Sequence, residues 1–504
     1  MIDSDVLERV LAVAGGDGAF AEVFVEDRRS SSAAFDDGKV EELTSSRDRG
    51  AGIRVVNGDS TGFAHTADLS EASLAETARI AASAARATGS RTRTVSIGEP
   101  TNHGARAVVL PADVPKARTV ELLGRADEVA RSQGDAITQV RAGYSASRRR
   151  IQVANTEGVS VTDDQVKTMF SVSCVASGDA GMQTGRESVG HTVGFELFDL
   201  VDVEELAQRA ASRALTKLAA RPAPSGRMTV VIGSGGGGVM FHEACGHGLE
   251  ADLVAKGASV FANRIGEQVA SPLVTLVDDG TMDGEWGRVG IDDEGRPAQR
   301  NVLIRDGVLV DYMWDSIRAR QQGRASSGNG RRQSYQHLPM VRMTNTYLLG
   351  GSGDAESIVA DTDAGVYIAH LGGGQVNTAT GDFVFGMTEA YLIENGRITE
   401  PLREGNLIGN GPAVLRDIDA VADDFSMGPP GTCGKDGRGC PWATGSRRCG
   451  STDSPSAEPR PESPVAPFSR SSDRIRRRAS GRRTGRGRDR PSRSRGSPRP
   501  WCGR

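Results

Sequence analysis

Apolar positions before residue 222 switch between helical and strand spacing. The helical spacing predicts helices at residues 5–14, 69–87, 115–133 and 202–220. Ser70 lies where the second of these needs an N-cap, and Asp37-Gly38 marks a hairpin between two strand patterns. Residues 137–193 have the pattern of a long strand meander. We therefore predict an N-terminal α/β region over residues 1–222, divisible into subdomains at about 1–110 and 111–222.

The pattern changes after a proline-rich segment, RPAPSGR, at residues 221–227. A strand pattern, a glycine-rich turn and the start of a helix follow in MTVVIGSGGGGVMFHEACGHGLEAD. Residues 272–437 consist mostly of short strand patterns separated by turn sequences such as DDG, RDG and ENG. This organisation predicts an α+β fold in which a β-rich C-terminal domain occupies residues 227–437.

Residues 438–504 differ from the rest of the chain in composition. Apolar residues nearly vanish there, and Arg, Ser, Pro and Gly dominate, so we predict a disordered C-terminal tail. The tail holds 18 of the 61 basic residues but only five of the 65 acidic ones, which leaves residues 1–437 with a net charge of −17. An acidic body argues against nucleic acid as the partner of residues 1–437.

The sequence has the features of an unexported protein. Its first ten residues, MIDSDVLERV, are acidic where a secretory signal is basic, and no apolar run reaches the roughly 18 residues of a membrane helix. Six cysteines without a CxxC spacing suit a reducing compartment. We expect a cytoplasmic protein that has no membrane partner and no structural disulfides.

Two imidazoles and a carboxylate lie within the six residues His242-Glu243-Ala244-Cys245-Gly246-His247. In the HExxH arrangement the histidines are four residues apart and face one side of a helix, while the glutamate polarises a metal-bound water. Here they are five apart, which on a regular helix leaves the rings roughly 140° from each other. A π-bulge or kink is needed to bring both rings to one ion, and Gly246 and Gly248 make such a distortion easy.

A catalytic zinc site also needs a third protein ligand and an open position. Cys433, in the turn-rich sequence GPPGTCGKDG, is the best-placed candidate by composition. Cys245 is a second candidate, although a small buried thiol is the preferred interpretation. Glu250 and Asp252 are further candidates, either as ligands or as hydrogen-bond partners of the imidazoles. The alternative, in which both histidines are ordinary helix residues without a metal, stays open at this point.

A competing motif overlaps the same segment. Gly233, Gly235 and Gly238 satisfy GxGxxG after the strand pattern MTVVI, as in dinucleotide-binding turns. Five of the six residues are Gly, so matches arise easily, and neither a return strand nor a ribose-binding acid is evident. We favour a flexible turn that lets the backbone approach a peptide substrate.

The segment HEACGHGLEAD is similar to the HExxxH segment of the TldD/PmbA metallopeptidase family. The likeness continues in FAEVFVEDRRSS, GAGIRVVNG, DDEGRPAQRNVLIRDGVLVDYMWD, RQSYQHLPMVRMTNTYLLGG, GGGQVNTATGDFVFGMTEAYLIENGRI, LIGNGPAVL and GTCGKDG. Together these segments cover most of residues 1–437. The chain resembles the TldD type, which carries HExxxH, and not the paralogue that lacks the motif and acts as the inactive partner.

The resemblance implies a β-rich C-terminal domain that holds zinc and a dimer that encloses the site. The partner would be a copy of the chain or the paralogue that lacks HExxxH. By position, His242, His247 and Cys433 would bind Zn²⁺, and Glu243 would be the general base. The expected activity is zinc-dependent hydrolysis of short or unfolded peptides.

Other roles stay open beside this one. The chain could be a catalytically impaired, zinc-containing partner or binding subunit of a peptidase complex, or a metal hydrolase that does not cut peptides. Tyr335, His337 and Asn345 are chemically able to donate to the oxyanion of the reaction, but strand packing and turn capping explain them equally well.

The resemblance stops abruptly after Asp436-Gly437, where the family continues with a Val-Pro-Val-Gly strand and ends in Pro-Thr-Leu-Arg. GC-rich codons for residues 438–453, RGCPWATGSRRCGSTD, can encode GVPVGDGQPTLRVDG when they are read two bases later. We therefore predict that residues 438–504 are a frameshift product and that the strands expected after Cys433 are lost. The rival interpretation is a natural basic tail that contacts nucleic acid through Arg478 and its neighbours.

Overall fold

The first half of the fold is built around long antiparallel strands. The structure is a computed structural model, and it describes residues 1–16, 18–87, 94–99, 101–104, 107–179, 181–446, 448–451 and 457–459. The strands of the first sheet are β1 Phe20–Asp36, β2 Lys39–Asn57, β3 Ser60–Thr66, β4 Thr101–His103, β5 Ile137–Asn155, β6 Ser160–Gly178 and β7 Gly181–His191. Their order is β3-β2-β1-β5-β6-β4, and β7 also pairs with β6. Only the β4–β6 pair is parallel among these strands.

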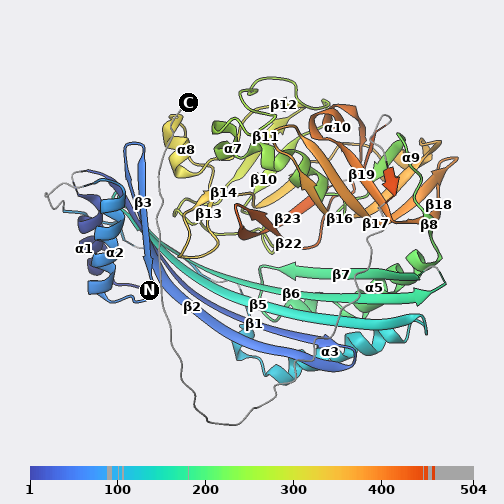
Figure 1. Ribbon diagram of the computed structural model, residues 1–504, viewed down its shortest axis with the longest axis horizontal. Coiled ribbons are helices and arrows are strands. Elements are labelled where there is room, and N and C mark those ends of the chain that lie inside the picture. Colours follow the sequence, from blue (N-terminus) through green and yellow to red (C-terminus); the bar gives the residue numbers. More distant parts are fainter. Residues whose placement is uncertain are drawn as a thin grey trace, which may run out of the picture. The chain divides into compact units, whose positions relative to one another are not determined.

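Helices cover this sheet in two groups. They are α1 Ser4–Gly15, α2 Glu71–Ala84, the short 3-10 turn η1 Pro111–Asp113, α3 Lys116–Arg131, α4 Leu197–Leu200 and α5 Val203–Ala219. Leu7 of α1 packs with Val23 and Ile53 of the sheet, because the apolar face of the helix needs a partner. Leu123 of α3 and Leu206 of α5 belong to a second apolar cluster. Figure 1 shows α3 and α5 on one face of the long strands and the second half of the chain over the opposite face.

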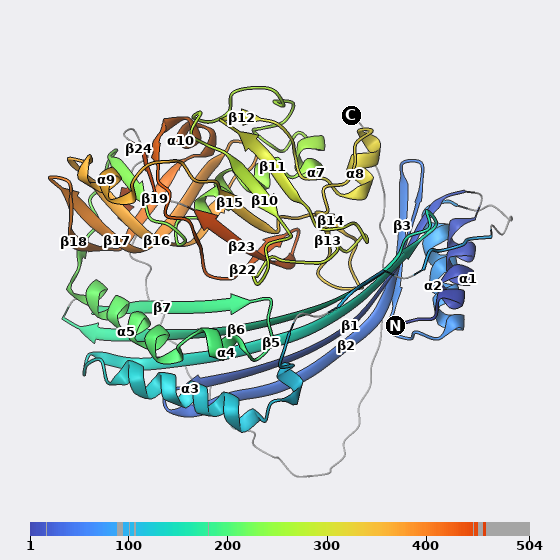
Figure 2. The same ribbon diagram turned by 180° about the vertical axis from the view of Figure 1, so that it is seen from behind.

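The second half consists of short strands in several sheets, visible from behind in Figure 2. Its strands are β8 Arg221–Pro222, β9 Thr229–Ile232, β10 Leu276–Asp279, β11 Arg300–Arg305, β12 Val308–Leu309, β13 Gly330–Arg331, β14 Met340–Val341, β15 Asn345–Leu348, β16 Ala364–Val376, β17 Asp382–Glu394, β18 Arg397–Arg403, β19 Gly405–Asn410, β20 Ile418–Val421, β21 Ser426–Met427, β22 Gly431–Lys435, β23 Arg438–Ser446, β24 Cys449–Ser451 and β25 Ala457–Pro459. Its α-helices are α6 Val239–Phe241, α7 Ala251–Ala255, α8 Ser316–Gln321, α9 Ala355–Ala360 and α10 Gly411–Asp417.

Two of these sheets position the candidate site. One has the order β12-β11-β10-β15-β23-β21, with β22 paired to β23. The other has the order β20-β24-β9-β16-β17-β18-β8, with β19 on β17 and β25 on β19. The second sheet contributes strand β9 to the site, and the first sheet contributes β22 and β23. Apolar residues of both sheets and of the segment between them form one continuous core.

A buried charge network, formed by Glu22, Arg54, Glu294 and Arg332, joins the two halves. Arg54 Nη2 lies 2.9 Å from Glu22 Oε2, and Arg54 Nη1 lies 2.7 Å from Glu294 Oε1. Arg332 Nη2 lies 2.6 Å from Glu22 Oε1. All four side chains are at most 1 % exposed. Pairing of this kind is what allows charges to be buried at all.

The predicted α+β class is confirmed, and the predicted helices of the first half all form. The expectation that ordered structure ends at Arg438 is wrong for the described part of that segment, because β23, β24 and β25 lie beyond it. Strand pairing uses main-chain groups, so β23 can join β15, β21 and β22 whatever its side chains are. Its residues Cys440 and Trp442 are buried. Residues 452–456 and 460–504 lie outside the described residues. No helix among the described residues is long and apolar enough to cross a membrane.

Candidate metal centre

The predicted distortion of the helix that carries the two histidines is confirmed. The chain passes from β9 through a glycine turn, in which Gly235 has a φ of +68°, into α6. Residues His242–Gly246 then form a π-helical turn, and His247–Leu249 form a 3-10 turn. A turn of this width brings residues five apart nearly into line, so both imidazoles point the same way.

The glycines of this segment serve close packing more than backbone freedom. Gly246 has ordinary helical angles, with φ −53° and ψ −49°. A Cβ atom at Gly246 would lie 2.3 Å from Sδ of Met343, and one at Gly248 would lie 2.7 Å from the ring of Phe261. Any larger residue would therefore push the turn away from the core beneath it.

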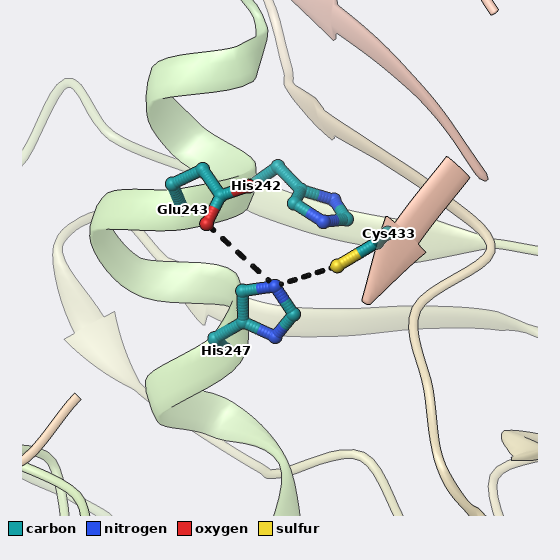
Figure 3. Close-up of side chains that lie close together, drawn as sticks. All are labelled: His242, Glu243, His247 and Cys433. Atoms are coloured by element: carbon teal, nitrogen blue, oxygen red, sulfur yellow. Dashed lines mark hydrogen bonds and ion pairs between the residues drawn. The ribbon is translucent and has the colours of Figure 1, made fainter. Parts of the chain in front are cut away.

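The residues His242, Glu243, His247 and Cys433 form one group, called the metal cluster below. One ligand atom from each lies within 4.8 Å of the ligand atoms of the others. Figure 3 shows the imidazoles, the carboxylate and the sulfur converging from the helical segment and from β22. His247 Nε2 lies 3.0 Å from Cys433 Sγ and 3.7 Å from Glu243 Oε2. The sequence places Cys433 186 residues from His247, so the fold supplies this contact.

His242 is fully buried, and both of its ring nitrogens lack a hydrogen-bond partner among the described residues. Burial, helped by His247 and Arg342, lowers the pKa of His242 well below its usual range. The ring is therefore neutral at physiological pH, and it has a free lone pair. Leaving two such atoms without a partner in the core is costly, which suits a side chain that awaits a ligand.

The carboxylate of Glu250 contacts Nδ1 of His247, the ring nitrogen that does not contact Cys433. His247 Nδ1 lies 3.1 Å from Glu250 Oε2, and Lys435 Nζ lies 2.9 Å from the same oxygen. Burial opposes charge on His247, but the Glu250 carboxylate and the Cys433 sulfur raise the pKa of His247 to about 10. Burial acts on Glu250 as well, yet Lys435 and His247 lower its pKa to about 2. An incoming cation would have to displace the proton on Nε2, while Glu250 keeps the proton on Nδ1.

The carboxyl group of Glu243 lies beside the rings and is 17 % exposed. Burial raises the pKa of Glu243 above its usual range, and His247 opposes this shift. A carboxyl group whose pKa is raised toward physiological pH is suited to take up a proton and return it.

The donor set fits zinc. Two imidazole nitrogens and one thiol sulfur are ligands that zinc prefers, and the unpartnered nitrogens of His242 show that one of them is available. Arg342 Nη2 donates to the Cys433 carbonyl at 2.6 Å and so fixes the strand that carries the sulfur. Glu250 contacts the ring of His247, a predicted ligand, which matches one of the two roles expected of Glu250.

Several other residues singled out by the sequence lie outside the metal cluster. Cys245 Sγ donates to the Phe241 carbonyl at 2.9 Å inside the apolar core, and burial raises its pKa to about 12. Asp252 pairs with Lys435 at 2.7 Å. The three residues considered as possible oxyanion donors make other contacts: Asn345 Nδ2 donates to the Asp279 carbonyl, Tyr335 OH accepts from Gln336, and His337 Nδ1 contacts Ser334.

Two residues next to the cluster were not predicted from the sequence. Lys435 lies two residues after Cys433 on the same strand and therefore on the same side, a spacing that could have been noticed. Trp442 stacks on His242 with ring centroids 3.9 Å apart, but it lies in the segment for which no ordered structure was predicted.

Comparison with known protein families covers nearly the whole described chain. Residues 21–85 match the PmbA/TldA metallopeptidase domain 1, residues 110–218 match the central domain, and residues 225–457 match the C-terminal domain. A protein named Metalloprotease TldD homolog from Haemophilus influenzae is 39% identical over 435 residues, which are 84% of this chain and 90% of that protein.

Solved structures show the same fold. A putative modulator of a DNA gyrase from Thermotoga maritima superposes with a TM-score of 0.75 at 20% identity, covering 90% of this chain and 99% of that one. TldE from Thermococcus kodakarensis superposes with a TM-score of 0.70 at 20% identity and the same coverage. The family matches, the TldD relative and the HExxxH segment together show that the chain is a TldD-type member of the TldD/PmbA metallopeptidase family.

Proposed function

We propose that the protein is a zinc-dependent peptidase that hydrolyses short or unfolded peptides in the cytoplasm. The metal cluster carries the proposal, because two imidazoles, a thiol and a free carboxyl group converge on one point. The described cysteines are all free, as a thiol ligand in a reducing compartment requires. The relative from Haemophilus influenzae, named a metalloprotease, supports the same activity.

In this proposal His242, His247 and Cys433 hold the zinc, which when bound supplies Lewis-acid activation of the peptide carbonyl and of water. Glu243 takes the proton of the attacking water and returns it to the departing amine. Its raised pKa favours both steps, since the group must carry the proton between them. Glu250 keeps the proton on His247 Nδ1, which fixes Nε2 as the nitrogen that faces the metal.

The substrate class is supported by an open strand edge near the cluster. Gly374, Gln375 and Val376 of β16 pair with β17 on one side, Gly372 and Gly373 lie in an irregularity of that pairing, and no described strand pairs with these five residues on the other side. Gly372 and Gly373 line a cleft of about 1200 Å³, and Gly373 has no neighbour where a side chain would be. An extended peptide could add to this edge through main-chain hydrogen bonds, and only unfolded segments can do so.

The proposed partner is a second subunit of the same family, either a copy of this chain or a paralogue that lacks HExxxH. The shared fold with the Thermococcus protein named TldE is consistent with such a pair. Size measurement of the purified chain, alone and with the paralogue, would distinguish the two assemblies.

The decisive variant is Glu243→Gln, which keeps the shape of the side chain and removes the base. We expect zinc content to stay the same and peptide turnover to fall by about a hundredfold to ten-thousandfold. Glu267→Gln is the matched control, because Glu267 is an exposed partner of Arg264 outside the cluster. Cleavage of a peptide library by mass spectrometry, with and without a chelator, measures the activity.

Full turnover in Glu243→Gln would contradict the mechanism. Bound zinc without cleavage in the wild-type protein, alone and with the paralogue present, would favour the alternative of a zinc-containing binding subunit.

A further inference from the structure

The indole of Trp442 lies between the metal cluster and the cleft. It stacks on His242 with ring centroids 3.9 Å apart and planes 23° from parallel. β23 places it there, because Trp442 faces Gly431 across the ladder with β22, two positions from the Cys433–Cys440 pair. A Cβ atom at Gly431 would lie 2.6 Å from the indole, so this glycine leaves the space that the ring fills.

Trp442 also lines the cleft of about 1200 Å³. The cleft is bounded by β7, α5, the glycine turn after β9, the open edge of β16 and the segment that leads into β22. Trp442 and Thr432 belong to its wall. None of the four residues of the metal cluster does, as far as the described residues go. The indole thus lines the cleft and also stacks on the ring of a proposed metal ligand.

Packing alone holds the ring in this place. Trp442 Nε1 is buried without a hydrogen-bond partner in the described part of the chain, and both nitrogens of His242 are in the same state. An indole N–H normally finds a partner when it is buried, and a ring without one is easier to displace. Trp286, also on the cleft wall, differs, because its Nε1 donates to the Gly431 carbonyl at 3.1 Å.

We propose that Trp442 controls the access of peptides from the cleft to the metal site and limits the size of the residues that can be cut. The inference rests on the proposed function and adds a specificity residue to it. A peptide carbonyl reaches the cluster from the cleft only past the indole. Small residues on either side of the scissile bond fit beside the ring, whereas bulky residues require it to move.

The first test is independent of catalysis. Zinc-loaded Trp442→Val should lose its metal to an excess of chelator several-fold faster than the wild-type protein, because the path from the cleft to the cluster is open. Trp442→Phe keeps a stacked ring and should be intermediate. Trp286→Phe changes the same cleft wall without touching His242, and its rate of zinc loss should equal that of the wild type.

The second test concerns specificity. Trp442→Val should raise kcat/KM by about tenfold or more for peptides with bulky residues at the cleavage site, and much less for peptides with Gly or Ala there. Unchanged zinc loss in both Trp442 variants, with circular dichroism and zinc content unchanged, would overturn the proposal. If Trp442→Val does not fold, the rate for Trp442→Phe decides between the two outcomes. A failure to cut any peptide would count against the proposed function alone, since zinc loss would still report on the barrier.

Discussion

The buried charge network draws residues from both halves of the chain, whereas the metal cluster lies in the second half, and the two differ in how their polar atoms are paired. Each charge of the network, on Glu22, Arg54, Glu294 or Arg332, has an opposite charge within 3 Å. In the metal cluster, both ring nitrogens of His242 have no partner among the described residues. The charges of the network are therefore paired within the protein, although Arg54 Nε and Nη1, Glu294 Oε1 and Arg332 Nε lack a hydrogen-bond partner among the described residues. The imidazole of His242 has no such pairing there.

The difference separates buried charges that are paired within the protein from a buried imidazole that we propose binds a metal. A paired network is costly to break, because removal of one charge leaves its partners buried and uncompensated. An unpaired imidazole in the core costs stability in the metal-free protein, and only a bound ligand offsets that cost. The two clusters should therefore respond in opposite directions to substitution.

The largest effect is expected for Glu22→Gln in the charge network. The substitution leaves Arg54 and Arg332 without one of their counter-charges, so the free energy of unfolding should fall by about 3–5 kcal/mol. Denaturant unfolding measures the change. Glu71→Gln, which breaks the exposed pair with Arg9, should leave the unfolding midpoint where it was. Equal effects of the two substitutions would remove the contrast between buried and exposed pairs.

A smaller effect of opposite sign is expected for His242→Leu. The leucine removes two unpartnered polar atoms from the core, so the metal-free protein should gain about 1 kcal/mol of stability while losing its zinc. Thermal unfolding with and without zinc separates the two effects. His191→Leu is the control, because Nδ1 of His191 contacts the Gly284 carbonyl and its loss brings no such gain. A metal-free His242→Leu protein that is less stable than the wild type would mean that His242 is a structural residue.

The metal cluster was easier to predict from the sequence than the buried charge network that joins the two halves. The histidines lie five residues apart, and that spacing predicted a π-bulge or a kink, of which the structure shows the π-helical turn. Cys433, the proposed third ligand, was selected from composition and family resemblance, since no local rule connects positions 186 residues apart. The charge network was not predicted at all, because Glu22 and Arg54 look like ordinary strand residues until the second half of the chain covers them.

The strand β23 was missed for a related reason. Its composition resembles the rest of the basic tail, but its backbone pairs with β22 and its apolar residues are concentrated at positions 440–443. The predicted loss of the strands after Cys433 is therefore wrong, whereas the proposed frameshift origin of residues 438–504 stays a prediction.

The smallest effect is expected from restoring the shifted reading of residues 438–453. The restored protein lacks Trp442, so it should exchange its zinc faster, yet it should melt a few degrees higher and bind zinc more tightly at equilibrium than this chain, because the original strands would hold Cys433 better. Resequencing of the gene checks the origin directly, because an intact frame through codon 438 in independent reads would end the idea. If the two proteins had the same melting temperature and the same zinc affinity, β23 of this chain would stabilise the fold and the metal site as well as the original strand does.

X-ray absorption at the zinc edge, on protein purified without added metal and then loaded with one equivalent of zinc, tests the central claim most directly. We expect two nitrogen ligands at about 2.0–2.1 Å and one sulfur ligand at about 2.3 Å, with the sulfur signal lost in Cys433→Ser. A zinc environment without sulfur in the wild-type protein, or one unchanged by Cys433→Ser, would contradict it.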